Sequence, residues 1–412
     1  HTACACECML QGHHESKMAS SAPSGEAVAS PTLESIPVQD MAALDVKDPV
    51  TEAVTEAAVP ETEAAEVPPH RSHDPTNNLK RSDPFQFGSR YLNEGDDVFE
   101  FNAWDHVETD DAYKEYAEEQ YAKQRQHPVS DFEKRKFSQD PARWWNLFYK
   151  NNAANFFKNR KWLQQEFPVL AEVTKEDAGP KVILEIGAGA GNTAFPVLAE
   201  NKNPQLKIHA CDYSKTAVEV IRKNEAYNPE FIQADVWDVT SDDLPPGLEE
   251  GSVDVAVLIF IFSALSPDQW AKAVHNVHRV LKPGGLVCFR DYGRGDLAQV
   301  RFRKGRYLDE NFYIRGDGTR VYFFDRDQLA DIWAGKVADE DVRATLEPAT
   351  ADSTAEAENG TDAAQNSDIE EIKTKIPLFE VEKLGVDRRL LVNRASKLKM
   401  YRCWLQGRFR KK

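Results

Sequence analysis

The chain lacks any apolar stretch long enough to cross a membrane. Its longest apolar run, VDVAVLIFIFSAL at residues 253–265, falls short of the roughly 20 residues that a transmembrane helix needs, and it is predicted to be a buried strand. The sequence also lacks a disulfide framework, because three of its six cysteines crowd into residues 4–8 and the others are scattered through expected strands. This usage favours a reducing compartment. The crowded cysteines, with His13 and His14, match a metal-binding pattern only weakly, and no metal site is predicted.

Basic residues are outnumbered, and the net charge of −17 on its own argues against a nucleic-acid partner. The acidic excess is concentrated in two segments. Residues 18–70 carry ten acids and one lysine, and residues 339–371 carry eleven acids and one arginine. The rest of the chain has a net charge of +2, and residues 388–412 contain ten basic residues and no acid. The part expected to fold is therefore near neutral with a basic end, and nucleic acid is not excluded.

Aromatic residues are almost absent from residues 1–80. Because such a segment cannot bury enough apolar surface to offset chain entropy, it is predicted to be a disordered acidic tail. Met18 is a plausible native start, which would place residues 1–17 outside the native chain. The tail is too acidic for a mitochondrial transit peptide, so a cytoplasmic location is expected, with the nucleus as an alternative. A second acidic, low-complexity segment at about 335–375 is predicted to be a disordered insertion.

Two regions are expected to fold. Residues 81–168 have helical patterns at 110–126 and 141–167. From residue 181 onward, strands and helices alternate. Strands are expected at 181–187, 207–212, 230–235, 253–265 and 284–293, and helices after residue 191, at 215–227 and at 267–281. This alternation predicts an α/β fold for residues 169–412 with a doubly wound, mainly parallel sheet, and the residues after 376 predict a closing antiparallel β-hairpin.

The stretch ILEIGAGAGNTAFPVL, residues 183–198, joins an expected strand to an expected helix through three alternating glycines. No lysine follows them as it does in a triphosphate-binding loop, and the spacing of Gly187, Gly189 and Gly191 misses the dinucleotide-binding fingerprint by one residue. A triphosphate and NAD are therefore poorly supported as ligands. Glycines at this place still let the backbone approach a ligand closely.

Three acids, Glu185, Asp212 and Asp235, end three expected parallel strands. Because the C-terminal ends of such strands line one crevice, the carboxylates are expected at a single ligand site. Asp212 can accept hydrogen bonds from both ribose hydroxyls, Asp235 can reach an adenine amino group, and Glu185 suits a sulfonium ligand with a free amino group. Ile259, ending the fourth strand, is expected to cover the adenine. The set fits a nucleoside without phosphates, since a pyrophosphate requires amide donors and a helix dipole.

The glycine turn, Asp212, Asp235 and the segment RVLKPGG at 279–285, in this order, resemble class I methyltransferases that bind S-adenosyl-L-methionine. Two longer segments, at 142–168 and 288–325, closely resemble the tRNA N3-methylcytidine methyltransferases. The resemblance covers about residues 83–335 and 376–412. It implies a class I methyltransferase (Rossmann-like) fold with an N-terminal helical RNA-binding extension. It also implies S-adenosyl-L-methionine as methyl donor and, as target, cytidine 32 in the anticodon loop of threonine, arginine or serine tRNAs.

The same resemblance implies which residues contact the cofactor. Trp145 and Tyr149 are one helical turn apart and share a face that can close over the cofactor as a lid. Ordinary helix packing is the alternative for these two aromatic residues. The implied contacts are Trp145, Tyr149, Gly189, Asp212, Asp235 and Ile259.

The implied methyl transfer requires little from the enzyme beyond the alignment of the base with the methyl group. Cytosine N3 has a free lone pair at neutral pH, so the enzyme must place it in line with the methyl group rather than remove a proton. Because the product ring is positively charged, a nearby carboxylate stabilises it, and Asp291 in the segment FRDYG is the candidate. Tyr292 can stack on the base, and Arg290 is the third catalytic candidate. An Arg290–Asp291 ion pair at a strand end is the structural alternative.

The target base must be unpaired and splayed out, because N3 lies on its Watson–Crick edge, and this requires a loop substrate. Basic residues interleaved with aromatics at 132–162, together with two further basic runs, are expected to flank the crevice and contact RNA phosphates, although a merely solvated surface is the alternative. The candidate tRNA-binding residues are Arg135, Arg160, Lys161, Arg301, Arg303, Lys304, Arg306, Arg408 and Arg410.

Two rival functions stay open at this level. One is a class I methyltransferase that acts on a protein or a small molecule, and the other is a non-catalytic RNA-binding protein with a methyltransferase fold. The expected partner is tRNA, bound through its anticodon stem-loop. Members of the family differ in whether they need an accessory protein, such as an aminoacyl-tRNA synthetase.

Overall fold

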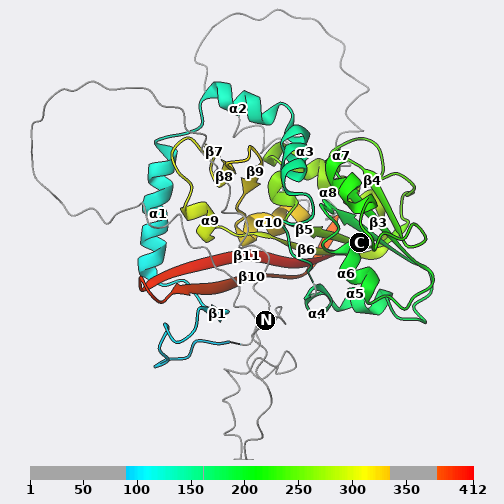
Figure 1. Cartoon of the computed structure of the whole chain (residues 1–412), viewed down its shortest axis with the longest axis horizontal. Helices are drawn as coiled ribbons and strands as arrows, with labels where there is room; N and C mark the ends of the chain where they lie inside the picture. The colour runs from blue at the N-terminus through cyan, green and yellow to red at the C-terminus, as the bar shows by residue number, and fades with distance from the viewer. Residues whose placement is uncertain (1–89, 161, 335–377) are drawn as a thin grey trace, which may run out of the picture. The chain divides into compact units, whose positions relative to one another are not determined.

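The computed structural model of the chain describes residues 90–160, 162–334 and 378–412 (Figure 1). All of these residues belong to one compact unit. Four of the sequence predictions concern other residues and lie outside the described ones: the acidic tail at 1–80, the insertion at about 335–375, Lys161 and the cysteines at 4–8.

An eight-stranded sheet with the order β1-β10-β11-β6-β5-β2-β3-β4 forms the centre of this unit. Strands β4, β3, β2, β5 and β6 are parallel, and β11, β10 and β1 extend the sheet by antiparallel pairing. A smaller antiparallel sheet has the order β7-β8-β9. The strands are β1 (Ala103–Asp105), β2 (Lys181–Ile186), β3 (Leu206–Asp212), β4 (Ile232–Val236), β5 (Val253–Ile259), β6 (Leu281–Tyr292), β7 (Tyr307–Asp309), β8 (Phe312–Ile314), β9 (Arg320–Tyr322), β10 (Phe379–Asn393) and β11 (Leu398–Lys411).

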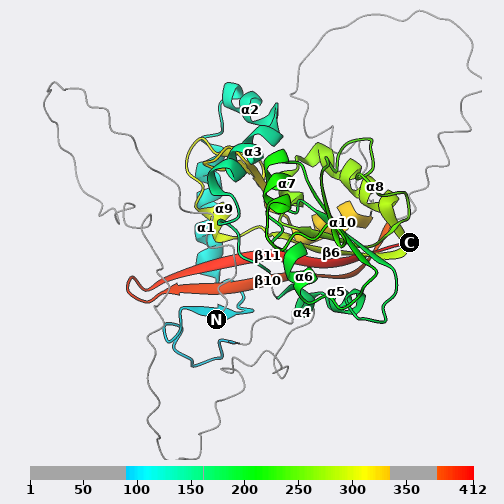
Figure 2. The ribbon, with the colours of Figure 1, turned by 45° about the vertical axis from the view of Figure 1, so that its right-hand side comes forward.

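Helices lie on both faces of the large sheet (Figures 1 and 2). They are α1 (Asp111–Arg125), α2 (Asp131–Ser138), α3 (Pro141–Asn152), α4 (Leu163–Glu166), α5 (Pro168–Val173), α6 (Ala194–Ala199), α7 (Lys215–Arg222), α8 (Trp270–Val280), α9 (Leu297–Val300) and α10 (Arg326–Ala334), with 3-10 helices η4 (Phe262–Ala264) and η5 (Pro267–Gln269).

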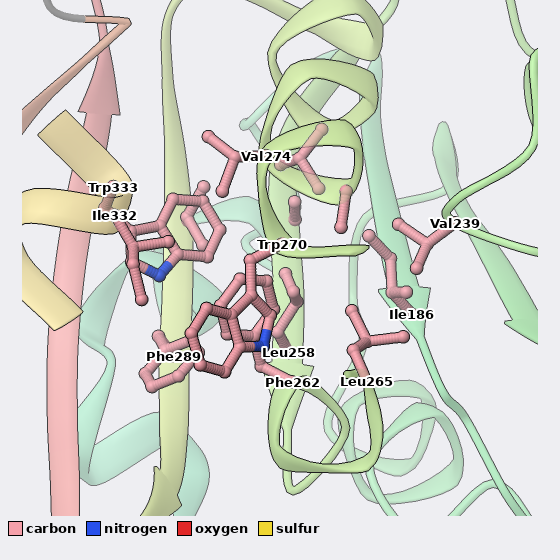
Figure 3. Packing of buried hydrophobic residues seen from close by; sticks show 14 of the residues in the cluster. Ile186, Val239, Leu258, Phe262, Leu265, Trp270, Val274, Phe289, Ile332 and Trp333 are labelled. Atoms are coloured by element: carbon pink, nitrogen blue, oxygen red, sulfur yellow. The ribbon is translucent and has the colours of Figure 1, made fainter. Parts of the chain in front are cut away.

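Alternation along the strands decides which helices cover which face, because successive side chains point to opposite sides of a sheet. In β2, Leu184 and Ile186 belong to a cluster with α8 and α10, whereas Ile183 belongs to a cluster with α5, α6 and α7. Figure 3 shows the first cluster, in which Trp270 and Trp333 from the two helices pack with residues of β5 and β6. Both faces of the parallel strands are therefore buried, and the strands read as nearly continuous apolar runs.

The expected α/β fold is confirmed. The five predicted parallel strands occur as β2 to β6, and the predicted closing hairpin occurs as β10 and β11. The three cysteines of the described residues, Cys211, Cys288 and Cys403, are buried and free, in β3, β6 and β11.

Two predicted boundaries were wrong. The helix expected over 141–167 ends at Asn152, where Ala153 adopts a φ of 47°, and helix resumes only at α4. The strand expected over 253–265 ends at Ile259, because Phe260 adopts a φ of 60° and the chain turns into η4. Strand β1, the β7-β8-β9 sheet and α10 are further elements that the sequence pattern did not reveal.

The N-terminal helices pack onto the α/β fold. In α1, the ring of Tyr113 lies 4.7 Å from that of Tyr401 in β11, and its hydroxyl donates to the Gly295 carbonyl at 3.1 Å. Tyr121 of the same helix donates to Gln299 of α9 at 3.1 Å. Helix α1 is therefore held by both the hairpin and the segment that follows β6.

Candidate active site

The glycine turn follows β2 and has a backbone that glycine adopts most readily. Gly187, Gly189 and Gly191 have φ angles of 70°, 58° and 81°, a region that penalises a Cβ atom. Space is also restricted. A Cβ on Gly189 would lie 2.4 Å from the hydroxyl oxygen of Tyr149, and one on Gly187 would lie 2.4 Å from Cγ1 of Ile261. Larger residues are therefore excluded, and the turn lies directly against α3 and the segment after β5.

Asp212 ends β3 directly beside this turn. Its Oδ2 accepts a hydrogen bond from the Gly189 N–H at 2.8 Å, and its Oδ1 accepts one from the Ser214 N–H at 2.8 Å. Burial raises the pKa of Asp212 to about 6. An ionised carboxylate has roughly four acceptor positions, so acceptor capacity remains for ribose hydroxyls. The turn and Asp212 together fit a nucleoside ligand.

Glu185 lies beneath the turn. It is 2% exposed. Its Oε2 accepts a hydrogen bond from the Ala194 N–H at 3.0 Å, and its Oε1 lies 3.8 Å from Nη1 of Arg160. Burial raises the pKa of Glu185 to about 7, although Arg160 favours the ionised form. This position supports the turn from below and leaves little surface for the ligand amino group that the sequence suggested.

Arg160 differs from the expectation of a tRNA-contacting residue. Its side chain is 10% exposed, and its Nη1 donates to Thr193 Oγ1 at 2.9 Å. Its backbone N–H also donates to the Asn192 carbonyl at 2.9 Å. Because a guanidinium buried beside Glu185 offers almost no surface to a phosphate, Arg160 belongs to the support of the glycine turn.

The C-terminal ends of β3 and β4 expose apolar surface that the sequence analysis missed. Tyr213 and Val236 are 37% and 41% exposed, and each directly follows a predicted ligand acid, which is the signal that would have found them. Asp235 is half-buried, pairs with Arg222 at 2.9 Å and accepts a hydrogen bond from Gln233 at 2.7 Å. Apolar side chains beside a strand-end carboxylate suit the face and the amino edge of an adenine.

Ile259, the predicted cover of the adenine, is the last residue of β5 and is 3% exposed. It belongs to the same buried cluster as Ala188 of the glycine turn. The residue therefore lies in the predicted region, and its contact with a ligand stays a prediction.

Helix α3 lies beside α7 in both views (Figures 1 and 2) and carries the two predicted lid aromatics. The rings of Trp145 and Tyr149 are stacked with centroids 6.3 Å apart, so they share a face as helical spacing predicts. Asn146 fastens this helix, because its Oδ1 accepts hydrogen bonds from Ser214 Oγ at 2.8 Å and from the Thr216 N–H at 3.2 Å. The sequence analysis missed Asn146, since no pattern in the segment marks the polar residue that faces α7.

Arg290 and Asp291 are neighbours in β6, so their side chains point to opposite faces. The Arg290 guanidinium lies between Trp162 and Trp404, with Cζ 5.1 and 4.8 Å from their ring centroids, and donates to Asp387 at 2.5 Å. Burial raises the pKa of Asp387, but the charges of Arg290, His106 and Arg389 and the hydrogen bond from Arg290 together outweigh this effect, and the net pKa is lowered. Arg290 therefore lies away from Asp291, and its ion-pair partner is Asp387, not the aspartate that the sequence alternative named.

Asp291 and Tyr292 are consecutive residues at the end of β6, and both are buried. Asp291 is fully buried, its Oδ2 accepts a hydrogen bond from the Ser263 N–H at 2.8 Å, and burial raises its pKa to about 6. Tyr292 is 2% exposed, and its ring lies 4.9 Å from that of Phe260. The guanidinium of Arg315 lies 5.5 Å from the Tyr292 ring. Arg315 is a residue of this site that the sequence analysis did not identify.

Two of the three predicted basic runs, the one at 132–162 and the one in the loop before β7, lie next to each other. The loop before β7 is joined to the connection between α1 and α2, because the Gly305 N–H donates to the His127 carbonyl at 2.8 Å. Two of the predicted residues in this loop, Arg301 and Arg306, are half-buried. The exposed cations on α2 and in the loop are Lys134, Arg135, Lys136, Arg303 and Lys304.

The third basic run, with Arg408 and Arg410 in β11, does not flank this site, contrary to the sequence prediction. Strand β11 is antiparallel to β6 and pairs Arg410 with Leu286, roughly 17 Å along the strand from Asp291. Arg410 pairs with Glu382 and donates to the Gly284 carbonyl at 2.7 Å, and Arg408 lies 3.9 Å from Glu382. Both arginines therefore lie toward the end of the sheet at which β6 begins, and both pair there with Glu382.

A parallel sheet of this order is closed by an antiparallel hairpin, and it has a glycine turn after its first strand and an acid at the end of its second. This combination defines a class I S-adenosylmethionine-dependent methyltransferase. A family model described as "Methyltransferase domain" matches residues 184–287, which span β2 to β6. Methyltransferases of this class take their methyl group from S-adenosyl-L-methionine, which is therefore the cofactor.

Relatives with known names identify the family within this class. The tRNA(Thr) (cytosine(32)-N(3))-methyltransferase of Saccharomyces cerevisiae is 47% identical over 81% of this chain and 47% of its own length. The tRNA N(3)-methylcytidine methyltransferase trm140 of Schizosaccharomyces pombe is 47% identical over 79% of this chain and 92% of its own. Mettl2 of Drosophila melanogaster, another tRNA N(3)-methylcytidine methyltransferase, is 38% identical over 81% of this chain and 90% of its own.

The chain belongs to the tRNA N(3)-methylcytidine methyltransferases. It spans about half the length of the S. cerevisiae relative and about nine-tenths of the other two. Its likeness to a solved S-adenosylmethionine-dependent methyltransferase of Methanosarcina mazei is loose, with 14% identity and a TM-score of 0.36 over 60% of this chain. Among the described helices, none is both long enough and apolar enough to span a membrane.

Proposed function

We propose that this chain methylates N3 of cytidine 32 in the anticodon loop of tRNA, with threonine tRNA as the first substrate to test and arginine and serine tRNAs next. The observation that carries the proposal is the 47% identity to a yeast enzyme named for this position of tRNA(Thr). The site supports it, because the turn, Asp212 and the apolar ends of β3 and β4 fit the nucleoside part of the donor.

The cofactor would be held by the C-terminal edge of the sheet and by α3. Asp212 would bind the ribose, Asp235 and Ile259 the adenine, and Trp145 and Tyr149 would cover the ligand from α3. S-adenosyl-L-methionine supplies an electrophilic methyl group on its sulfonium when bound. Glu185 and the glycines would shape the turn beneath it.

The protein need only orient the target base, since cytosine N3 is already nucleophilic at neutral pH. Methylation leaves a positive charge on the ring. The Asp291 carboxylate, buried at the end of β6, would stabilise that charge through space, because electrostatic effects are stronger in a water-excluded site. Its role is therefore electrostatic, with no proton to accept from N3.

The tRNA would be bound by the cations of α2 and of the loop before β7. Phe132 in the first turn of α2 is 69% exposed and adds an aromatic surface to this basic face, a combination that binds single-stranded RNA. An accessory protein, such as an aminoacyl-tRNA synthetase, belongs to the proposal on family resemblance alone. A cytoplasmic location, with the nucleus as the alternative, is proposed from the acidic character of residues 18–70.

Nucleoside mass spectrometry tests this function. After incubation of unmodified and cell-derived tRNAs with protein and donor, we expect 3-methylcytidine in threonine, arginine or serine tRNA, and its loss when cytidine 32 is replaced by uridine. Donor binding without 3-methylcytidine in any tRNA, alone or with cell extract as a source of accessory proteins, would favour a protein or small-molecule methyltransferase. Absence of donor binding in calorimetry would favour a non-catalytic RNA-binding protein.

A further inference from the structure

The residue after β5 has a backbone conformation that its side chain disfavours. Phe260 has a φ of 60°, and a bulky residue enters this region only when its surroundings impose it. Two hydrogen bonds do so here. The Phe260 N–H donates to the Arg290 carbonyl at 2.8 Å, and the Ser263 N–H donates to Asp291 Oδ2 at 2.8 Å. Strain of this kind is concentrated at functional sites.

This conformation places Phe260 between the two halves of the site. The next residue, Ile261, lies against Gly187 of the glycine turn. Phe260 itself packs against the cluster that includes the turn and also against the cluster that contains Tyr292. Its ring therefore stands at the boundary between the predicted cofactor site and the predicted base site.

The exposure of the aromatic rings distinguishes Phe260 from Tyr292. Tyr292 is 2% exposed, and its ring is occupied by Phe260 at 4.9 Å and Phe323 at 5.6 Å. A ring enclosed in this way has no free face for a nucleobase. Phe260 is only partly buried, so part of this residue remains accessible.

Resting on the proposed function, we propose that the target cytosine stacks on the ring of Phe260 and that Tyr292 supports this ring from behind. An aromatic face is the group that holds a flipped base in an active site. The strained turn aims the ring, and the hydrogen bonds from Phe260 and Ser263 to β6 keep it in place. Phe260 is thus the residue that touches the base, a role that the sequence analysis gave to Tyr292.

The test compares substitutions that separate the ring from the backbone strain. Phe260→Leu keeps apolar bulk without a π face, and Phe260→Tyr keeps the face. We expect kcat/KM for tRNA to fall about 5- to 150-fold in the Leu variant, the equivalent of about 1–3 kcal/mol of base stacking. The Tyr variant should stay within a few-fold of the parent. Calorimetric affinity for S-adenosyl-L-methionine should be the same in all three proteins.

A tRNA carrying the fluorescent base pyrrolocytidine at the target position gives a second readout, which a purely structural role would not change. Stacking quenches this base, so the complex with the Leu variant should emit more than the complex with the parent.

Phe260→Gly and Phe260→Ala control for folding, and the Gly variant should melt at the higher temperature because glycine tolerates a φ of 60°. Normal turnover and equal emission in the Leu variant would overturn the inference, whereas a parent protein that makes no 3-methylcytidine would refute the proposed function instead.

Discussion

Burial strongly changes the acidity of three carboxyl groups at the ends of central strands. Burial raises the pKa of Glu185 to about 7 and the pKa values of Asp212 and Asp291 to about 6. Each is held by backbone N–H donors, which favour the charged form but do not offset burial. The candidate site therefore contains groups that change charge between pH 5 and 8, although methylation of cytosine N3 requires no general base.

The stability of the protein should depend on pH through Glu185. Its folded-state pKa of about 7 lies above the ordinary 4.5, so the native state binds the proton more tightly than the unfolded state. The stabilisation from this proton is complete below about pH 4.5 and is lost as the pH rises through 7. In urea unfolding, the parent should lose more stability between pH 5 and 8 than Glu185→Gln, which carries no titrating group there. The exposed Glu172→Gln serves as control and should follow the parent. Parallel pH profiles for the parent and Glu185→Gln would contradict the buried, protonated state.

At the scale of secondary-structure elements, the contact between α3 and α7 connects the helix that carries Trp145 and Tyr149 to Asp212. Asn146 of α3 accepts a hydrogen bond from Ser214 Oγ, and the Ser214 N–H donates to Asp212. The serine hydroxyl also caps α7 through the Ala217 N–H at 3.2 Å. One polar side chain thus connects α3 to the carboxylate that ends β3.

Asn146→Ala should therefore weaken cofactor binding without touching the cofactor. Removing one side chain that accepts two hydrogen bonds costs about 1–3 kcal/mol, and part of this loss should appear as an S-adenosyl-L-methionine affinity lower by roughly tenfold. Calorimetry measures the affinity, and tRNA binding in the absence of donor should change much less. Asn151→Ala, at an exposed position of the same helix, is the matched control. Equal donor affinity in the two variants would show that α3 closes without this contact.

The elements that the sequence predicted best are those set by local pattern. Apolar runs and turn residues located β2 to β6, because these strands are buried on both faces. The helix break at Ala153 and the strand end at Phe260 were missed, since each depends on a positive φ that tertiary contacts impose on a residue with no such preference. For the same reason, the sequence grouped Arg290 with Asp291 by adjacency, although β-strand alternation sends Arg290 to Asp387 on the other face.

At the scale of the whole molecule, position on the sheet separates cations that pair with a local acid from cations that are exposed. The cations of α2 and of the loop before β7 are exposed and share one region, whereas Arg408 and Arg410 lie toward the opposite edge and pair with Glu382. The net charge of −17 hides this separation, because the acidic excess is confined to residues 18–70 and 339–371. The charge that an RNA meets is therefore a property of one face and not of the chain.

The salt dependence of tRNA binding distinguishes the exposed cations of α2 and of the loop before β7 from the paired arginines of β11. Each phosphate contact releases counterions, so the logarithm of the affinity falls linearly with the logarithm of the salt concentration. Arg135→Ala should weaken tRNA binding and reduce the slope by about 1, and Arg303→Ala should do the same from the neighbouring loop. Arg410→Ala removes an equal charge from the opposite edge and should leave the slope unchanged. Filter binding of full-length tRNA at several salt concentrations, with donor affinity as a check on folding, distinguishes the variants. An equal reduction of the slope by all three would mean that the RNA path reaches the opposite edge of the sheet and that Arg410 leaves Glu382 to meet it.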